Sequence, residues 1–226
     1  METAYHPTQR TTPTRYRERA HYDRVTVHGI LDEALVCHLG YVSDDRPVVL
    51  PTTHCRVGET LYLHGSTGSA PMLAAKRAGL PVCVTATLVD GLVLARSAMH
   101  HSLNYRSVVV LGTARLVEDQ TEKRRALAAL LDHIRPGRAA DCRPPNAREL
   151  AATAVLALDL VEVSAKVRDG GAVDDPQDHA LPYWAGVIPL HLVAGTPQPA
   201  GRACLHADTP QNPYNQAPSR ARGGNS

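Results

Sequence analysis

The chain has 226 residues, of which 43% are hydrophobic and 20% charged, and its net charge at neutral pH is +2. No apolar run approaches the roughly 20 residues that a membrane-spanning helix needs, so these values argue against a membrane protein. The near-balance of 24 basic and 22 acidic residues also argues against a nucleic-acid partner. Because residues 1–20 hold no apolar segment of the signal-peptide kind, we expect a cytoplasmic protein.

Composition divides the chain into three predicted segments. Residues 1–20 are polar and include Arg15, Arg17 and Arg19, so we expect a flexible, solvated arm. Residues 21–198 carry regular hydrophobic periodicity and are predicted to form one folded domain. Residues 199–226 are rich in Pro, Gly, Asn and Arg without periodicity, which predicts a disordered tail.

Cysteines and histidines do not form a recognisable metal or disulfide pattern. The five cysteines are widely spaced, and three of them lie in apolar runs, where cysteine behaves as a small hydrophobic residue. The sequence has no His-Glu-x-x-His motif, and the adjacent His100 and His101 would point to opposite faces of a strand. We therefore predict neither a disulfide framework nor a metal site.

The first half of the domain reads as one helix followed by strands. Asp23 is a predicted N-cap, after which Val27, Ile30 and Leu31 recur at helical spacing. Apolar runs at 35–42, 47–57 and 61–63 then read as strands, separated by turn residues at 44–45 and 58–59. Connections this short cannot cross between parallel strands, so the strands must pair antiparallel.

The second half continues the same pattern. A short helix after the loop at 63–69 ends at Gly79, and Asp90-Gly91 between apolar runs at 82–89 and 92–95 predicts a tight hairpin. A long strand at 105–117, helices with capping boxes at Asp119 and Asn146, and a last long strand at 155–167 follow. Six or seven antiparallel strands with peripheral helices predict a small barrel in an α+β domain.

The loop at 63–69 carries the most informative local pattern. Its hydroxyl-bearing residues Ser66, Thr67 and Ser69 precede a helix, and such a loop presents hydroxyls, backbone N–H groups and a helix N-terminus to one point, as phosphate sites do. It lacks the lysine of a P-loop, the three glycines of a dinucleotide fingerprint and the first glycine of a nucleophile elbow. The alternative is a polar turn in which Ser69 caps the following helix.

Several segments together resemble the FMN-binding split barrels related to pyridoxamine 5'-phosphate oxidase, within them the flavin-nucleotide-binding branch that includes the nitroimidazole-resistance proteins. The resemblance covers roughly residues 22–192. The segments that carry it are YDR at 22–24, LYLHGSTGS at 61–69, PVCVT at 81–85, HSLNYRSVV at 101–109, SAKVR at 164–168 and WAGV at 184–187.

The resemblance implies an α+β fold, a six-stranded antiparallel split β-barrel with peripheral helices, that forms a homodimer with FMN at the subunit interface. It places the backbone near Pro51, Thr52 and Thr53 beside the polar edge of the flavin ring. The phosphate would be held in the loop, whose candidate cofactor-binding residues are His64, Gly65, Ser66, Thr67 and Ser69.

One departure from the family pattern concerns the phosphate. Members of the branch commonly have arginine directly after the last serine of the loop, where this chain has Ala70 and then Pro71. Losing that guanidinium removes a charge-assisted contact worth about 1.5–3 kcal/mol unless another cation replaces it. Arg106 is the preferred replacement, with Lys76 or Arg77 as a further source of charge. The two helix residues would equally suit a solvated face, and Arg106 an ion pair at the dimer interface.

The implied function is an FMN-dependent oxidoreductase that takes electrons from NAD(P)H and reduces a small planar acceptor such as a nitro compound or a quinone. His64 is the candidate catalytic residue, as a proton relay beside the flavin, with a turn-capping role as the alternative. A non-catalytic flavin-binding module is a different class that the sequence leaves open. So are deazaflavin as the cofactor and a haem-binding split barrel, for which the possible ligands are His54, Cys55, His64 and His100.

Overall fold

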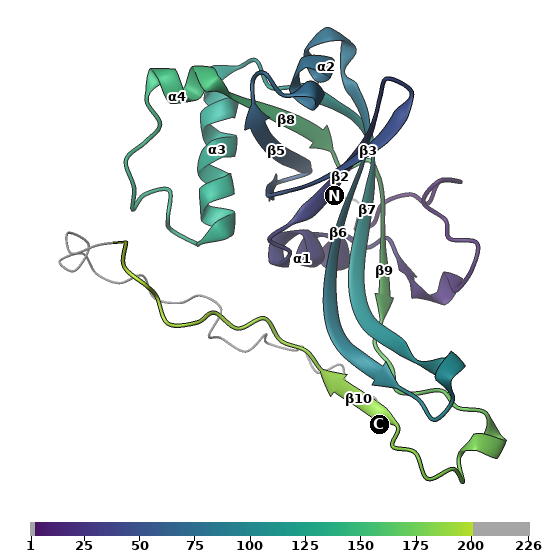
Figure 1. Ribbon diagram of the computed structural model, residues 1–226. Helices are drawn as coiled ribbons and strands as arrows, with labels where there is room; N and C mark the ends of the chain where they lie inside the picture. Colours follow the sequence, from purple (N-terminus) through teal and green to yellow (C-terminus); the bar gives the residue numbers. More distant parts are fainter. Residues whose placement is uncertain (1–2, 201–226) are drawn as a thin grey trace. The chain divides into compact units, whose positions relative to one another are not determined.

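The computed structural model describes residues 3–200 (Figure 1). Within this range the chain forms ten strands, four α-helices and three short 3-10 helices. In chain order they are η1 (Arg17–Arg19), β1 (Ala20–His21), α1 (Arg24–Glu33), β2 (Cys37–Ser43), β3 (Arg46–Thr52), β4 (His54–Val57), β5 (Thr60–Ser66), α2 (Ala70–Ala78), β6 (Leu80–Leu94), η2 (Ala98–His100), β7 (Ser102–Leu116), α3 (Gln120–Ile134), α4 (Ala147–Ala152), β8 (Thr153–Asp159), β9 (Glu162–Arg168), η3 (Pro176–Asp178) and β10 (Gly186–Pro189).

All the strands pair antiparallel in one sheet, which confirms the α+β antiparallel class. The main path is β3-β2-β6-β7-β8-β5-β4, with β9 beside β7, β1 beside β9 and β10 beside β6. The two halves of the sheet meet where the end of β7 pairs with β8, through Arg115 and Leu116. The ten strands exceed the six or seven predicted, and β3 and β4 end the path as edges.

Two predicted long strands are each divided into two, which corrects the sequence-based expectation. The run at 47–57 breaks at Thr53, so that β3 pairs with β2 while β4 pairs with β5. The run at 155–167 breaks at Leu160, whose backbone N–H donates to the carbonyl of Glu59 at 2.8 Å instead of continuing the ladder. At both breaks the chain passes from one half of the sheet to the other.

The predicted hairpin at Asp90-Gly91 is wrong, because β6 runs straight through it. The ladder with β7 shifts register between Val89 and Gly91, which marks a bulge, and the chain reverses only after Leu94. A Cβ on Gly91 would lie 3.1 Å from the carbonyl oxygen of Ile188 in β10. The glycine therefore serves the close approach of a third strand, and Figure 1 shows β10 alongside the far end of β6.

The helix-start predictions at Asp23, Asp119 and Asn146 are confirmed in position. Asp23 accepts a hydrogen bond from the N–H of Thr26, and Asn146 and Glu149 form a complete capping box. Asp119 accepts from the N–H of Glu122, but the Glu122 carboxylate binds Tyr62 and Arg115 instead of returning to the cap. That carboxylate thereby ties α3 to β5 and β7.

Two apolar clusters hold the domain together. The larger one fills the space between the sheet and the helices α1 and α2, with Ile30, Leu63 and Val110 among its fully buried members. The smaller one lies under α3 and includes Tyr62 and Leu130. No helix within residues 3–200 is long and apolar enough to cross a membrane.

The segment predicted as a flexible arm makes ordered contacts along much of its length. Tyr5 is buried, and its hydroxyl donates to the Glu59 carboxylate at 2.9 Å. Thr8 donates to Glu162 in β9 at 2.5 Å. The predicted tail at 199–226 lies almost entirely outside the described residues, and residues 190–200 contain no helix or strand.

Candidate functional site

The hydroxyl-rich loop connects the end of β5 to the first turn of α2. Its shape is set by Ser66, whose carbonyl accepts from the backbone N–H of Ser69 at 3.0 Å and from the Ser69 hydroxyl at 2.8 Å. The N–H of Thr67 donates to the carbonyl of Ala152 at 3.0 Å, so the loop is also tied to α4. Ser69 occupies the N-cap position without capping the helix through its side chain.

These internal bonds determine what the loop can offer a ligand. The N–H groups of Thr67 and Ser69 are used within the protein, and Pro71 in the first turn of α2 has no N–H. The side chains of Ser66 and Thr67 are exposed. An anion would therefore be bound mainly by hydroxyl groups and the positive end of the short helix, and less by a nest of backbone N–H groups.

Gly65 allows the helix to approach the strand closely. A Cβ at Gly65 would lie 2.9 Å from Cε of Met72, which is buried in the first turn of α2. The methionine can shift, but only by disturbing the packing that holds the helix N-terminus against β5. Gly65 thus has a structural reason to be small, whether or not it also contacts a cofactor.

His64 is the exposed residue immediately before this glycine. It lies opposite Val155 of β8 in the ladder, and its imidazole is exposed beside the loop. Among residues 3–200 no hydrogen bond or ion pair is found for its side chain. The ring is therefore available to a ligand bound at the loop, and it is not held in one orientation by a carboxylate or carbonyl.

The predicted ring-binding residues lie at the edge of the sheet. Pro51 and Thr52 belong to β3, and Thr53 is the corner residue between β3 and β4. Pro51 is exposed, the two threonines are half-buried, and the Thr52 hydroxyl donates to the Thr53 carbonyl at 3.4 Å. Because β3 pairs with protein on one side only, its outer edge offers main-chain donors and acceptors to a ligand.

The candidate phosphate cations on α2 and on β7 have different surroundings. Lys76 is exposed on the last turn of α2. Arg106 binds Glu33 through both Nη atoms at 2.5 and 2.8 Å, and binds Asp90 through Nε and Nη2 at 3.0 and 2.8 Å. Hydrogen bonds to Glu33 first, and to Asp90 second, raise the pKa of Arg106 further above its usual value. The positive charge of Arg106 is therefore balanced by two carboxylates of the same chain.

Arg106 is also far from the loop of its own chain. Ser66 pairs with Thr153 at the start of β8, whereas Arg106 lies ten residues before Leu116, which pairs with β8. At about 3.3 Å per residue that separation is roughly 33 Å along β7. Arg106 could act on a phosphate only at the loop of a second copy, so the structure does not bring these two predicted parts together in one chain.

The candidate haem ligands separate clearly by burial. His54 is fully buried, its Nε2 lies 2.9 Å from the Leu31 carbonyl oxygen, and burial lowers its pKa to about 4. Cys55 is buried too, and burial raises the pKa of its thiol to about 12, which disfavours the thiolate. His100 is half-buried, and its Nδ1 is buried without a hydrogen-bond partner. Of these four candidates, His64 is exposed and His100 is half-buried, whereas the other two lie in the core.

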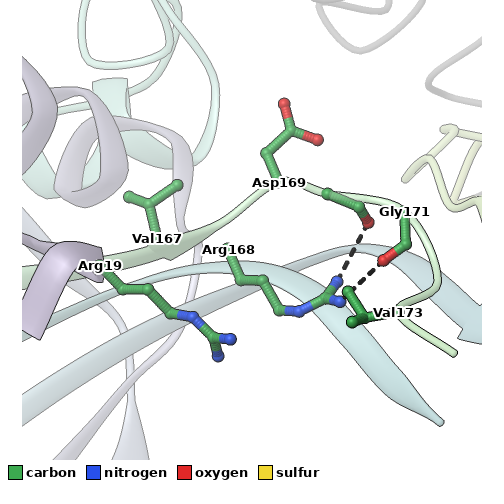
Figure 2. Close-up of a pocket in the computed structure, with 7 residues that line it drawn as sticks. Arg19, Val167, Arg168, Asp169, Gly171 and Val173 are labelled. Atoms are coloured by element: carbon green, nitrogen blue, oxygen red, sulfur yellow. Dashed lines mark hydrogen bonds between the residues drawn. The ribbon is translucent and has the colours of Figure 1, made fainter. Parts of the chain in front are cut away.

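A feature that the sequence did not predict lies at the end of β9. Residues from η1, from the end of β9 and from the segment after β9 line a surface hollow of about 330 Å³, shown in Figure 2. The side chains of Arg19 and Arg168 extend in the same direction along it. The alternation of arginines at 15, 17 and 19 was the available sequence signal, but nothing in it indicated that Arg168 lies beside them.

The antiparallel sheet with strands that turn corners, its open edge at β3 and the short helix behind a hydroxyl-rich loop define a split-barrel protein. The family model described as pyridoxamine 5'-phosphate oxidase matches residues 23–167. The chain belongs to this family, which confirms the resemblance seen in the sequence. Comparison with curated proteins gave no match.

Solved structures add more specific neighbours. The flavocytochrome Anf3 from Azotobacter vinelandii is 39% identical, with 92% of this chain and 96% of that chain covered and a TM-score of 0.84. The FAD and haem binding protein from Mycobacterium smegmatis is 37% identical, with 87% and 95% covered and a TM-score of 0.79. A protein described as a 5-nitroimidazole antibiotic resistance protein from Bacteroides thetaiotaomicron shares the fold at 22% identity, with 66% and 86% covered and a TM-score of 0.56.

Proposed function

We propose that this protein is a redox protein that binds a flavin nucleotide, FMN or FAD, together with haem. The observation that carries the proposal is the similarity, at 39% and 37% identity over nearly the whole chain, to a flavocytochrome and to a protein that binds FAD and haem. Haem was a secondary alternative in the sequence analysis. These two neighbours make it part of the main proposal.

The chain's own residues fit a flavin nucleotide. The free edge of β3 near Pro51, Thr52 and Thr53 suits the polar edge of the ring, and the exposed hydroxyls of Ser66 and Thr67 suit the phosphate. Lys76 on α2 is an exposed candidate for the cation, whereas Arg106 is already matched by carboxylates. A bound flavin supplies hydride and electron transfer, for which the protein provides binding and orientation.

The fit to haem selects among the predicted ligands. An axial ligand needs an imidazole nitrogen that can reach the iron, and the packed interior around His54 prevents this without unfolding part of α1 or α3. His64 and His100 are the two histidines of that group whose rings are not enclosed in the core. We therefore propose one of them as the haem ligand. If His64 binds iron, it does not also serve as the proton relay.

We propose a homodimer as the working form. Several large apolar side chains are exposed on the edge strand β3, on its neighbour β2, and near the ends of β6, β7 and β10. They are Val42, Val49, Leu50, Val89, Leu103, Trp184 and Ile188, the last two flanking the start of β10. Such a collection on one monomer indicates an interface. Trp184→Ala should then shift the sedimentation profile toward monomer.

The test of the cofactor proposal is the visible absorption spectrum of the purified protein, followed by chromatography of the released cofactors. Two flavin bands with a Soret band are expected, and the released nucleotide distinguishes FMN, FAD and deazaflavin. A colourless protein that takes up neither added flavin nor added haem would overturn the proposal and leave the family assignment intact.

A second candidate, a non-catalytic flavin-binding module, is favoured by one observation. His64 has no carboxylate within the described structure to set its orientation, which a dedicated proton relay usually has. The two candidates differ in turnover: a reductase oxidises NADH or NADPH when a nitro compound or a quinone is present, whereas a binding module does not. Anaerobic stopped-flow measurement of flavin bleaching by each nicotinamide separates them.

A further inference from the structure

The hollow beside the end of β9 is built from two segments far apart in the sequence. Arg19 comes from η1, and Val167, Arg168 and Gly171 come from β9 and the residues after it. Its volume of about 330 Å³ is at the small end of the range for sites that bind small molecules. Figure 2 shows both guanidinium groups on one side of the backbone and the Asp169 carboxylate pointing away from them.

Arg168 is held rigidly by neutral partners. Its guanidinium donates to Oδ1 of Asn104 and to the carbonyls of Gly170 at 3.1 Å and Gly171 at 3.0 Å. Asn104 is itself buried and also accepts from the N–H of Gly170. An amide and two carbonyls fix the position of the guanidinium but do not neutralise it, so its full positive charge remains at the hollow.

Arg19 is positioned by an aromatic ring. Its guanidinium carbon lies 4.1 Å from the centroid of Tyr16, and its carboxylate neighbour Glu18 is 3.8 Å away with a side chain 69% exposed. Two further cations approach the same ring, Arg15 at 5.4 Å and Lys166 at 5.9 Å. Cation–π contacts orient these groups without cancelling their charges.

The pattern differs from that of three other half-buried arginines in the described structure. Arg56, Arg96 and Arg106 each have a carboxylate oxygen within 2.9 Å. Arg19 and Arg168 line the hollow together with Asp169, and Arg15 and Lys166 lie near the Tyr16 ring that Arg19 covers. Like charges in proximity destabilise the folded chain. A bound anion would relieve that repulsion and would find guanidinium groups already placed.

We propose that this hollow is a binding site for a phosphate-bearing small molecule, with a diphosphate group as the unit recognised. Paired guanidinium groups match the several oxygens and the multiple charge of a diphosphate better than they match a single carboxylate. The site is distinct from the hydroxyl-rich loop, which lies at the opposite end of β7. The inference therefore does not depend on how the loop binds flavin.

Pyrophosphate binding to the full-length protein, measured by calorimetry at low ionic strength, tests the site. Arg19→Gln should weaken binding at least tenfold and Arg19→Lys by a smaller factor, because lysine keeps the charge but lacks the planar fork that matches phosphate oxygens. Arg17→Gln is the matched control: Arg17 lies in the same short helix, is exposed and does not line the hollow. It should bind as the wild type does.

Three outcomes would overturn the proposal. These are no binding of pyrophosphate at millimolar concentration, an equal loss in Arg17→Gln and Arg19→Gln, or a loss confined to the Ser66→Ala/Thr67→Ala protein, which would place the anion in the loop. A cooperative thermal unfolding transition of Arg19→Gln will show that the variant is folded. Pyrophosphate should raise the unfolding temperature of the wild type but not that of Arg19→Gln. ADP binding more tightly than pyrophosphate would identify a nucleotide as the source of the diphosphate, and equal binding would indicate the inorganic ion.

Discussion

Two histidines ten residues apart, on the neighbouring strands β4 and β5, have opposite surroundings. His54 is fully buried, bonded to the carbonyl of Leu31 and packed 4.9 Å from the ring of His133. His64 is exposed beside the loop. The same contrast separates Arg106, matched by two carboxylates, from the exposed Lys76. The partner that a polar group has in the fold, and not its residue type, decides whether it supports the structure or remains available to a ligand.

The largest effect is expected for His54 in acid. Burial lowers its pKa from 6.5 to about 4, so below pH 6.5 the unfolded chain binds a proton that the folded chain does not. Stability is therefore highest above about pH 6.5, falls as the pH drops to about 4 and then levels off, with a total loss of about 3 kcal/mol. Urea unfolding of the wild type at several pH values measures this slope.

His54→Gln tests whether His54 causes this pH dependence of stability. The glutamine keeps a hydrogen-bond donor for the Leu31 carbonyl but cannot titrate. The variant should be less stable at neutral pH and lose about 2 kcal/mol less than the wild type between about pH 7.5 and pH 5. An unchanged slope would show that other groups cause the acid sensitivity.

The next largest effect is expected in the exposed loop that follows His64. Replacing Ser66 and Thr67 with alanine removes two hydroxyls predicted to bind phosphate, so FMN affinity should fall by about 10- to 100-fold. Riboflavin, which has no phosphate, should bind nearly as well as before. Fluorescence titration with both ligands measures the difference, and equal losses for both would mean that the loop does not contact phosphate.

Arg106→Gln should lower the free energy of unfolding by about 1–2 kcal/mol, because it leaves Glu33 and Asp90 without their shared, partly exposed cation. The control is Lys76→Gln, which changes an exposed charge and should alter stability by less than about 0.5 kcal/mol. If Lys76 contacts the phosphate, that variant should instead weaken FMN binding. A stable Arg106→Gln protein would mean that the ion pairs contribute little.

The smallest effect on stability is expected for His64→Ala, about 0.5 kcal/mol or less, since the imidazole is exposed. Its functional effect distinguishes the roles proposed above. Loss of the Soret band would identify His64 as the haem ligand, whereas an unchanged spectrum with slower acceptor reduction would identify a proton relay. Wild-type spectrum and wild-type rates together would leave His64 with neither role.

Local chemistry predicted helix starts better than strand ends. The N-caps at Asp23 and Asn146 act within three residues, so the sequence contains all the information that they need. Asp90-Gly91 has the composition of a hairpin turn, yet Asp90 bonds to Arg106 and Gly91 admits β10. Partners distant in the sequence override a turn signal, and the same holds for the corners at Thr53 and Leu160.

The sequence by itself determined the family, the antiparallel α+β class, the helix starts and the hydroxyl-rich loop, because each depends on residues close together or on motifs in a fixed order. Tertiary structure decided which histidine is enclosed, that Arg106 is matched by Glu33 and Asp90, and that Arg168 lies near Arg19. These facts depend on contacts between segments 16 to 149 residues apart, which a local pattern does not encode. Only the tertiary structure therefore decided which charged side chains remain available to a ligand.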